Sequence, residues 1–283
     1  ITKDILKNIY KKQTESSRKY ESGLLIIIGG SEFYSGSPAL SALAAFRSGA
    51  FMTRIIAPQR AADIIASFSP ILAAYPLEGH HLTKKHLSTI ITQVESAKLV
   101  SRGKTSVVVG GGAGRNEETQ EVIREFLAQS SVPVVIDADA IYALEKNPEI
   151  ISGKNFLITP NPYEFFILTK KDIQQLSEEQ KIKIIQEEAS RLQTTLLVKG
   201  DADIISDGKE VAVSRGGSFR RKGGMGDSLA GICGSLVART GNIFESACAA
   251  SYINKKALEL AADKFQDSLI ATDLIEAIPD VIK

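Results

Sequence analysis

The sequence predicts an α/β protein in which helices cover a mostly parallel sheet. Short apolar runs recur along the chain, and a longer segment with helical periodicity follows most of them. The first run, Leu24–Ile28, has five consecutive apolar residues, as expected for a strand buried on both faces of a sheet. The chain of 283 residues has no linker rich in Pro, Gly or Ser and no internal repeat, so we expect a single domain over residues 1–283.

Strands are expected where short apolar runs end in glycine or polar residues. Leu24–Ile28 leads into Gly29-Gly30-Ser31, and the run at residues 106–109 leads into five residues of which four are glycine. Asp207-Gly208, between two late runs, is typical of a tight hairpin. The expected strands are residues 24–28, 51–57, 71–75, 106–109, 132–136, 155–158, 195–198, 204–206 and 211–213.

Helices are expected where apolar residues return every three or four positions. Pro38 suits the first turn of a helix, because its missing N–H would have no partner there. The expected helices are residues 1–12, 38–49, 83–97, 117–129, 178–192, 227–239, 244–262 and 272–278. Strands that alternate with helices at this spacing favour βαβ units, and therefore a mostly parallel sheet.

Composition and charge exclude several classes of protein. The formal net charge is +1, so no basic surplus indicates nucleic acid as a partner. No stretch of about 18 apolar residues predicts a membrane span, and the charged N-terminal segment does not resemble a signal peptide. Cys233 and Cys248 lie in apolar helical patterns, which favours buried thiols over a disulfide or a zinc site. We therefore expect a cytoplasmic protein that binds neither nucleic acid nor membranes.

The most informative stretch is the glycine-rich turn Gly223-Gly224-Met225-Gly226, which Asp227 follows. A glycine turn lets backbone N–H groups approach a ligand closely. The small apolar residues after it predict a helix, whose start adds unpaired N–H groups and the positive end of a dipole. Together these features form an anion site, for which phosphate is the expected anion. Asp227 at this position is either the N-cap of the helix or a base beside the phosphate.

Six clusters of polar or glycine residues directly follow strands or begin this helix. Ligands of an open α/β sheet bind outside the carboxyl ends of its strands, so we expect the six to converge on one cleft. The clusters are residues 29–37, 110–114, 137–139, 159–164, 199–203 and 223–227. The glycines at 110–114 match neither a Walker loop nor a dinucleotide fingerprint. The residues alone leave three substrate classes open: nucleotide-dependent phosphoryl transfer, another phosphorylated substrate, or a dinucleotide.

Asn161 and Glu164 stand three residues apart at an expected helix start. The helix dipole alone favours a glutamate there. The same carboxylate can also serve Mg²⁺, directly or through water, because this ion prefers oxygen ligands and keeps several waters beside nucleotide phosphates. Lys199, at the end of a strand, either contacts phosphate or is solvated, and Asp201 and Asp203 can be turn formers.

The order of these motifs resembles the ribokinase-like superfamily, in which a nucleotide phosphate lies over a glycine-rich turn and an aspartate ends that turn as a base. Within it, the chain is most similar to the NAD(P)H-hydrate dehydratases, from Leu25 to about Ala250. The similarity is carried by Ile28-Gly29-Gly30-Ser31, Tyr34-Ser35-Gly36-Ser37-Pro38, Ala45-Phe46-Arg47-Ser48-Gly49-Ala50, Gly110-Gly111-Gly112-Ala113-Gly114, Ile136-Asp137-Ala138-Asp139-Ala140, Leu157-Ile158-Thr159-Pro160-Asn161, Val198-Lys199-Gly200 and the glycine-rich turn.

The resemblance implies a ribokinase-like three-layer α/β/α sandwich and a hydro-lyase that repairs hydrated NADH and NADPH (NADHX and NADPHX). The family uses ADP or ATP, with Mg²⁺, to phosphorylate the added hydroxyl and then eliminates phosphate. The resemblance also implies a homo-oligomer, with a homotetramer as the expected form. The alternative with the same fold is an ATP-dependent kinase of a small hydroxymethyl compound or sugar, which would leave a stable phosphorylated product. A third alternative, a nucleotide-sensing or scaffold protein, would have no need of the base Asp227.

Carried onto this sequence, the resemblance makes Asp227 the general base that contacts the substrate hydroxyl. It implies nucleotide contacts for Lys199, Gly200, Asp201, Ala202, Asp203, Gly224, Met225 and Gly226. It implies contacts with the hydrated cofactor for Ser37, Gly112, Asn161 and Asp227, and with Mg²⁺, through water, for Glu164.

The chain departs from the family at some of these positions. Asp203 stands where a threonine is common, and Ser37 where an alanine is usual. Asn161 begins Asn-Pro-Tyr-Glu where His-Pro-Gly-Glu is frequent. Arg18-Lys19-Tyr20 and Arg220-Arg221 also replace family motifs. A further anion at Asp203 is unexpected beside phosphates, so these departures bear on the substrate and nucleotide rather than on the fold.

Overall fold

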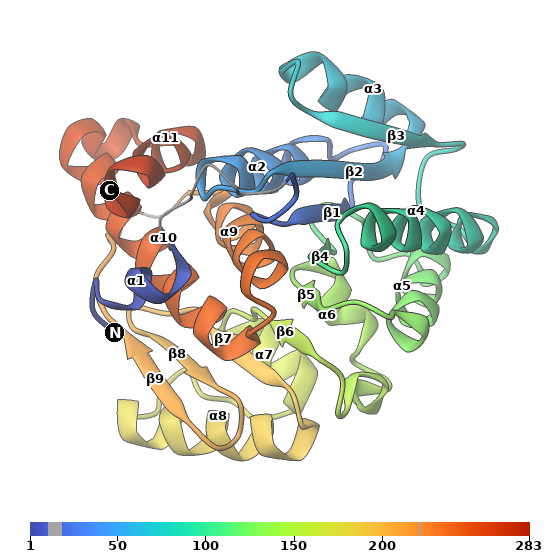
Figure 1. Ribbon diagram of the computed structural model, residues 1–283. Helices are drawn as coiled ribbons and strands as arrows, with labels where there is room; N and C mark the ends of the chain where they lie inside the picture. Colours follow the sequence, from blue (N-terminus) through green and yellow to red (C-terminus); the bar gives the residue numbers. More distant parts are fainter. Residues whose placement is uncertain (11–18, 221) are drawn as a thin grey trace.

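The computed structural model describes residues 1–10, 19–220 and 222–283, and these residues form one sheet of nine strands (Figure 1). The order across the sheet is β3-β2-β1-β4-β5-β6-β7-β8-β9. The strands are β1 (Leu24–Ile28), β2 (Met52–Pro58), β3 (Ala73–Leu77), β4 (Thr105–Val109), β5 (Val134–Ile136), β6 (Phe156–Ile158), β7 (Thr195–Val198), β8 (Asp203–Ser206) and β9 (Val211–Ser214). Each expected strand is therefore present, with ends that differ from the prediction by two residues or fewer.

The pairing confirms a mostly parallel sheet. Strands β1 to β7 pair in parallel, and only β8 and β9 add antiparallel pairs, as the hairpin at Asp207-Gly208 predicts. The chain builds outward from β1 to β3, then returns to β4 beside β1 and builds the other way. The carboxyl ends of β1 and β4 are thus the topological switch point, where open α/β sheets bind ligands. Two hydrogen bonds hold the loops together there, from Gly30 N to Gly111 O (2.9 Å) and from Gly110 N to Ile28 O (3.0 Å).

The helices connect successive strands and close the chain at its C-terminus. In the part of the chain that the structure describes they are α1 (Ile5–Ile9), α2 (Gly36–Arg47), α3 (Gln59–Phe68), α4 (Leu87–Val100), α5 (Glu117–Gln129), α6 (Asp139–Ala143), α7 (Pro162–Thr169), α8 (Glu178–Leu192), α9 (Met225–Thr240), α10 (Ile243–Phe265) and α11 (Ala271–Ile282), with short 3-10 helices at Lys84–His86, Pro148–Ile151 and Gln266–Ser268.

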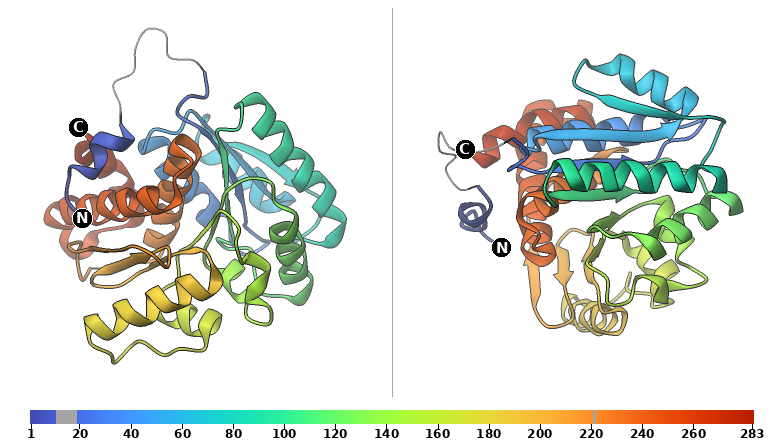
Figure 2. Two further views of the ribbon diagram at one scale, coloured as in Figure 1. Left: turned by 60° about the horizontal axis from the view of Figure 1, so that its bottom comes forward. Right: turned by 45° about the vertical axis from the view of Figure 1, so that its right-hand side comes forward.

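Strand β1 shows how the sheet divides the core into two layers. Leu25 and Ile27 belong to an apolar cluster with side chains of α2, α9, α10 and α11. Leu24, Ile26 and Ile28 belong to a second cluster with α4, α5, α6 and α8 on the opposite face (Figure 2). All five side chains are at most 2% exposed. Burying each of them contributes about 1.5–3 kcal/mol. The predicted three-layer α/β/α sandwich is confirmed.

Some helices differ from the prediction. The sequence analysis missed α3 and α6: α3 starts at Gln59, directly after the last residue of β2, with no turn residues to announce it. The helix expected at residues 1–12 is shorter, since α1 ends at Ile9. Residues 11–12 lie outside the described residues, as do two of the departures from the family, Arg18 and Arg221.

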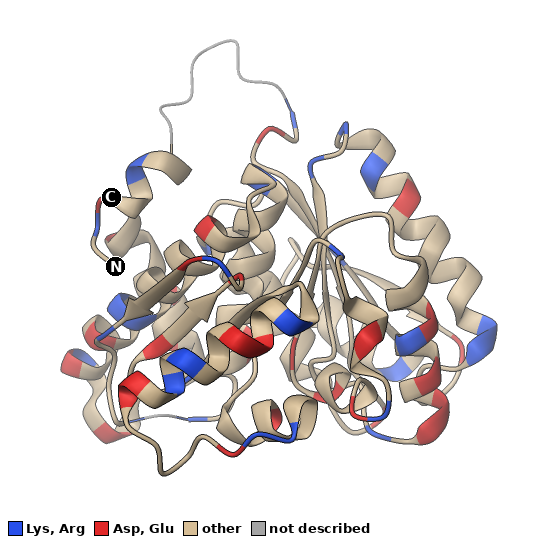
Figure 3. Ribbon diagram, turned by 90° about the horizontal axis from the view of Figure 1, so that it is seen from below, with Lys and Arg blue, Asp and Glu red and all other residues tan. Residues whose placement is uncertain are grey.

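The surface has no excess of one charge. Lysines and arginines are interspersed with aspartates and glutamates along the outer helices (Figure 3). None of the described helices combines the length and apolar character that a membrane span requires. Cys233 and Cys248 are free and buried, as their apolar surroundings predict.

Candidate active site

The α2 side of the site is formed by Ser37, Gly111, Gly112 and Asp227. A Cβ at Gly111 would lie 2.9 Å from Asp227 Oδ1 and 3.2 Å from Ser37 Cβ. A Cβ at Gly112 would lie 3.5 Å from Ser37 Oγ. The starts of α2 and α9 and the glycine loop after β4, which are distant in the sequence, therefore meet at one point. Glycine is required at this point because any side chain at Gly111 would fill the space in front of the Asp227 carboxylate.

The β7 side of the site is centred on Lys199, at the end of β7. Its Nζ lies 2.7 Å from Asp137 Oδ1 and 3.8 Å from Glu164 Oε2. A Cβ at Gly226 would lie 3.6 Å from the same Nζ, so the glycine-rich turn borders both sides of the site. All six clusters expected from the sequence thus contribute residues to one region at the carboxyl edge of the sheet.

Asp227 is held by the way α9 packs on α2. Gly224 is the residue before the helix, with φ 90°, and Asp227 is the third helical residue, so it does not serve as the N-cap. Ser41 Oγ donates a hydrogen bond to Asp227 O at 2.9 Å. One turn later, a Cβ at Gly231 would lie 2.0 Å from Ser41 O. Only glycine permits this approach, which fixes the Asp227 backbone against α2.

The environment of Asp227 suits a base near neutral pH. Burial, and then the negative charge of Asp137, raise the pKa of Asp227 to about 7, while a hydrogen bond with Ser37 and the Lys199 ammonium oppose the rise. A carboxyl with this pKa is about half ionised at neutral pH. General bases are most effective when their pKa lies near the working pH.

Lys199 stays charged although it is largely surrounded by protein. Burial by itself lowers the pKa of an ammonium, but Asp137, Glu164 and Asp227 raise that of Lys199 above its usual value. Asp137 is 2% exposed, and its Oδ1 accepts hydrogen bonds from both Lys199 Nζ and Thr159 Oγ1, each at 2.7 Å. The ion pair with Asp137 therefore fixes the Lys199 ammonium beside the glycine-rich turn.

Asp139 shapes the glycine loop after β4. Its Oδ2 accepts a hydrogen bond from Gly114 N at 2.9 Å, and its Oδ1 accepts one from Arg115 Nε at 2.7 Å. The Arg115 guanidinium also lies 3.5 Å from the centre of the Tyr142 ring. Between the two aspartates of this cluster, Ala138 has φ 49° and ψ −123°, a conformation that residues with a Cβ rarely adopt. Such strain persists only where the surrounding structure enforces it.

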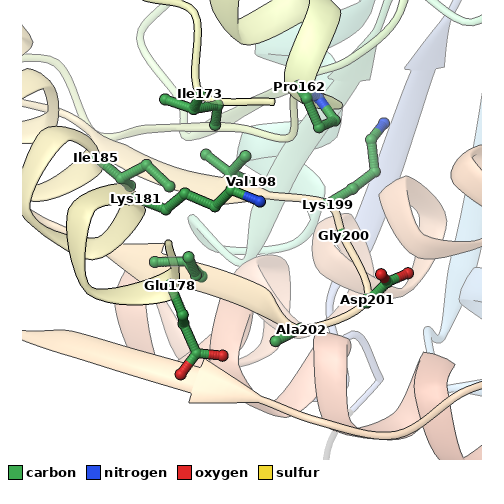
Figure 4. A pocket seen from close by; sticks show the side chains of 11 residues that line it. Pro162, Ile173, Glu178, Lys181, Ile185, Val198, Lys199, Gly200, Asp201 and Ala202 are labelled. Atoms are coloured by element: carbon green, nitrogen blue, oxygen red, sulfur yellow. The ribbon is translucent and has the colours of Figure 1, made fainter. Parts of the chain in front are cut away.

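A pocket of about 450 Å³ opens between the start of α9 and the segment after β7. It is lined by Asn161, Pro162, Lys181, Lys199, Gly200, Asp201, Asp203, Lys222, Met225, Gly226, Leu229, Asn254, Lys255 and Leu258. A smaller pocket of about 160 Å³ lies between α8 and the Val198–Ala202 segment (Figure 4). Of the residues expected to bind nucleotide, six line the larger pocket and Ala202 lines the smaller one. Gly224 lines neither pocket, and a Cβ there would meet Leu40 at 2.6 Å, so glycine allows tight packing at this position.

Of the three other residues expected to contact a hydrated cofactor, only Asn161 lines the larger pocket. Ser37 and Gly112 border Asp227 on the α2 side. Asn161 lines the pocket on the other side and is the N-cap of α7, since its Oδ1 accepts hydrogen bonds from Tyr163 N and Glu164 N, both at 2.9 Å. The side-chain oxygen Oδ1 of Asn161 is thus used by the helix, and the side-chain nitrogen Nδ2 is the atom left to contact a ligand.

Glu164 completes the capping box of α7 and also faces Lys199. Its Oε2 accepts a hydrogen bond from Asn161 N at 2.8 Å, which is the helix-start role that the sequence left open. Burial raises the pKa of Glu164 above its usual range, against the effect of Lys199. No group of three or more His, Cys, Asp or Glu side chains among the described residues can hold a metal ion. The residues fit Mg²⁺ as it is usually held beside nucleotides, by phosphates, waters and one or two carboxylates.

Asp203 is used inside the protein. Its side chain is buried, Oδ1 accepts a hydrogen bond from Gly200 N at 3.0 Å, and Oδ2 accepts one from Ser251 Oγ at 2.7 Å. Lys255 Nζ lies 3.2 Å from the same Oδ1. The negative charge that was unexpected beside phosphates is therefore neutralised by a buried lysine of α10.

Sequence reasoning missed several residues around the larger pocket. Lys255 and Asn254 come from α10, in a segment whose only evident signal was its apolar periodicity. Lys255 could have been noticed, because a lysine interrupts the run of small and apolar residues that face the core. Asn254 Oδ1 is buried and accepts no hydrogen bond from the described residues. A buried acceptor on the wall of a pocket is available for a donor group of a ligand.

The nine-stranded sheet and its helices have the ribokinase-like fold, as two solved structures show. A ribokinase-like superfamily protein from Enterococcus faecalis superposes with a TM-score of 0.81 at 23% identity, over 100% of this chain and 94% of that one. An ADP/ATP-dependent NAD(P)H-hydrate dehydratase from Bacillus subtilis, co-crystallized with ATP and Mg²⁺, gives a TM-score of 0.77 at 21% identity, over 99% and 96% of the two chains. These similarities establish the fold.

The chain belongs to the NAD(P)H-hydrate dehydratase family, whose model matches residues 25–280. It is 36% identical, over 94% of its length, to the bifunctional NAD(P)H-hydrate repair enzyme Nnr of Pyrobaculum aerophilum, and it covers 52% of that protein. It is 32% identical over its whole length to the ADP-dependent (S)-NAD(P)H-hydrate dehydratase of Cenarchaeum symbiosum, 96% of which it covers. The chain thus spans about half the length of the first curated relatives and nearly all of the latter.

Proposed function

We propose that this chain is an ADP-dependent (S)-NAD(P)H-hydrate dehydratase, a hydro-lyase that restores NADH and NADPH from their hydrates. The observation that carries the proposal is Asp227, a carboxyl with a pKa of about 7 between the α2 side and the pocket at Lys199. The family to which the chain belongs and the name of the Cenarchaeum symbiosum relative support the reaction and the use of ADP.

In the first step, the oxygen of the substrate hydroxyl attacks the β-phosphorus of ADP. Asp227 accepts the proton of this hydroxyl at the same time. The bond from that phosphorus to the bridging oxygen breaks, and AMP leaves. The negative charge that spreads over the transferring group meets the N–H groups at the start of α9 and the ammonium of Lys199. Fixed donors and charges of this kind supply most of the catalysis of phosphoryl transfer. A positioned base adds a factor of about 10²–10⁴.

In the second step, the phosphorylated oxygen leaves the ring with the electrons of its carbon–oxygen bond. The neighbouring ring carbon loses a proton and the double bond of the dihydronicotinamide is restored. The balance is hydrate plus ADP to NAD(P)H, AMP, inorganic phosphate and a proton. A closed glycine loop at Gly111 and Gly112, against Ser37, would hold the ring close to Asp227 throughout.

Mg²⁺ bound to the nucleotide would neutralise phosphate charge, with Glu164 as the residue proposed to hold it through water. The Bacillus subtilis protein of the same fold was co-crystallized with ATP and Mg²⁺, which supports this part of the proposal. The resemblance alone supports a homotetramer in the cytoplasm, and light scattering of the purified chain tests the number of copies.

The test is incubation with the purified S hydrate and either ADP or ATP. The proposal predicts recovery of the near-ultraviolet absorbance of NADH, with one phosphate released for each NADH formed and faster turnover with ADP. A kinase of the same fold would instead leave a stable phosphorylated product and release no phosphate. Absence of NADH recovery with both nucleotides would refute the proposal.

A further inference from the structure

Lys255 is a buried lysine beside the larger pocket that the proposed reaction does not use. It lies on α10 and is 5% exposed. An ammonium taken out of water is costly unless charges and hydrogen bonds compensate it. The neighbouring lysine of the helix, Lys256, shows the ordinary alternative: it is 42% exposed and pairs with Glu259 at the surface.

The Lys255 ammonium contacts three oxygens of one short segment. Its Nζ donates hydrogen bonds to Gly200 O at 3.1 Å and to Asp201 O at 3.0 Å, and it lies 3.2 Å from Asp203 Oδ1. Gly200 and Asp201 lie in the connection between β7 and β8, and Asp203 is the first residue of β8. Lys255 thus ties α10 to the whole of this connection rather than to one side chain.

Asp203 completes the arrangement from within the segment. Its Oδ1 accepts a hydrogen bond from Gly200 N at 3.0 Å, and its Oδ2 accepts one from Ser251 Oγ at 2.7 Å, one helical turn before Lys255. Both oxygens of the carboxylate are therefore used, and the segment is anchored to α10 at two levels. Asp203, which the resemblance assigns to the nucleotide site, lines the larger pocket and is also an internal anchor of its wall.

The anchored segment forms one wall of both pockets. Gly200 and Asp201 line the larger pocket and the smaller one, and Ala202 lines the smaller one (Figure 4). A Cβ at Gly200 would lie 2.8 Å from Ala202 O, so the turn is tight. Displacement of such a wall by about 1 Å is enough to lose much of the binding or catalysis that depends on it.

Stability alone is a weak reason for this arrangement. Replacement of a buried ion pair by apolar side chains of similar size is often neutral or stabilising, whereas removal of one partner leaves a costly unpaired charge. A pair whose hydrogen bonds fix a ligand-binding wall has a role that apolar side chains do not replace.

We propose that Lys255 and Asp203 are positioning residues that hold the Gly200–Asp201 backbone in the shape that binds the nucleotide. This rests on the proposed function, since it assumes that the larger pocket takes ADP or ATP. The pair acts on nucleotide affinity and leaves the hydrate site on the α2 side unchanged.

The test measures the Kd of ADP by calorimetry, the KM of the hydrate and the thermal midpoint in four variants: Lys255→Met, Asp203→Asn, the double variant and Lys256→Met. Both single variants lower the thermal midpoint, because each leaves a buried charge unpaired. The double variant recovers the midpoint, yet its Kd for ADP stays raised by about tenfold or more, because the two hydrogen bonds from Lys255 that tie the Gly200–Asp201 backbone to α10 are absent. The KM of the hydrate changes less than about twofold in the double variant, since Ser37, Gly112 and Asp227 line neither pocket.

Lys256→Met is the matched control, because it removes an exposed lysine one position along α10. It leaves the Kd of ADP at the wild-type value. If the double variant binds ADP as tightly as the wild type, the pair serves stability only and the inference is wrong. If the wild type itself binds neither ADP nor ATP, the proposed function fails instead, which separates the two failures.

Discussion

Asp203 lines the larger pocket and Asp227 lies on the α2 side of the site, and the surroundings of these two aspartates are opposite. Asp203 accepts hydrogen bonds from Gly200 N and Ser251 Oγ and pairs with the ammonium of Lys255. Asp227 has its backbone fixed by Ser41, but its carboxylate is buried near the negative charge of Asp137. Burial and this charge raise the pKa of Asp227 to about 7.

This difference in surroundings distinguishes an aspartate that anchors the structure from an aspartate that is suited to catalysis. Both oxygens of the Asp203 carboxylate accept hydrogen bonds and one of them faces an ammonium, so Asp203 suits an anchor. A carboxylate whose charge is poorly compensated accepts a proton at neutral pH, which is what a general base must do. Residue type and position in the motif do not show which of the two aspartates is the anchor and which is the base. The groups around each carboxylate do.

Replacement of Asp227 gives the largest expected effect. Asp227→Asn lowers kcat by a factor of about 10²–10⁴, because it removes the proton acceptor and keeps the shape. Asp203→Asn, measured at saturating ADP, retains kcat within about tenfold, because the anchor does not touch the reacting atoms. Steady-state rates of NADH recovery check both variants. Equal losses of kcat in the two would remove the distinction drawn between them.

Asp227→Asn is also expected to raise the stability of the folded chain at neutral and higher pH. The pKa of Asp227 is higher in the folded chain, about 7, than its usual 3.8. The favourable contribution of the protonated carboxyl is thus complete below about pH 4 and is lost as the pH rises through about 7. Asp227→Asn is therefore more stable than the wild type above pH 7, by roughly 2–4 kcal/mol, and the gap narrows in acid. Urea unfolding at several pH values measures it, and a gap that widens toward low pH contradicts the assignment.

Lys199 is a cation whose removal is expected to destabilise the fold, because its buried partner, Asp137, then has no ammonium beside it. Lys199→Met leaves Asp137, 2% exposed, without its ammonium and is expected to cost about 3–5 kcal/mol of stability. Addition of Asp137→Asn restores most of that stability, because no unpaired charge then remains. Denaturant unfolding of the single and double variants measures the effect. A double variant no more stable than Lys199→Met would show that this pair is not coupled.

The packing that presents Asp227 is tested at Gly231. A Cβ there would lie 2.0 Å from Ser41 O, so Gly231→Ala pushes α9 away from α2 and costs about 1–3 kcal/mol. Gly36→Ala is the control, because a Cβ at Gly36 meets nothing within 4 Å. The thermal midpoint of the control stays equal or rises slightly. Similar losses in both variants would mean that the close approach of the two helices is not the cause.

Much of the fold follows from the sequence because its signals are local. Apolar runs predicted each strand, and the boundaries of α5, α8 and β7 agree with the prediction to the residue. Asp227 was also found locally, since a glycine turn and a helix start are adjacent in the chain. Asp203 was assigned to the nucleotide because residues 199–203 resemble the family's nucleotide-contacting segment. Its actual partner, Lys255, comes from a distant helix, and no local pattern contains that pairing.

The smallest effect is expected at the strained residue between Asp137 and Asp139. Ala138 has φ 49°, and Ala138→Gly relieves this strain at the cost of a more flexible unfolded chain. The net change in stability is expected to be within about 1 kcal/mol, in favour of glycine. A stability loss above this size in denaturant unfolding would show that the alanine methyl group contributes packing that outweighs the strain.

The pH dependence of kcat/KM for the hydrate, at saturating ADP, tests the role of Asp227 most directly. This parameter reports the pKa of the group in the enzyme before the hydrate binds. The account predicts a rate that rises with pH, with its midpoint near pH 7, the pKa that burial and Asp137 give Asp227. The midpoint should persist in Asp203→Asn and disappear from the residual rate of Asp227→Asn. A profile that is flat between about pH 5 and 9, or that keeps its midpoint in Asp227→Asn, would contradict the assignment of Asp227 as the base.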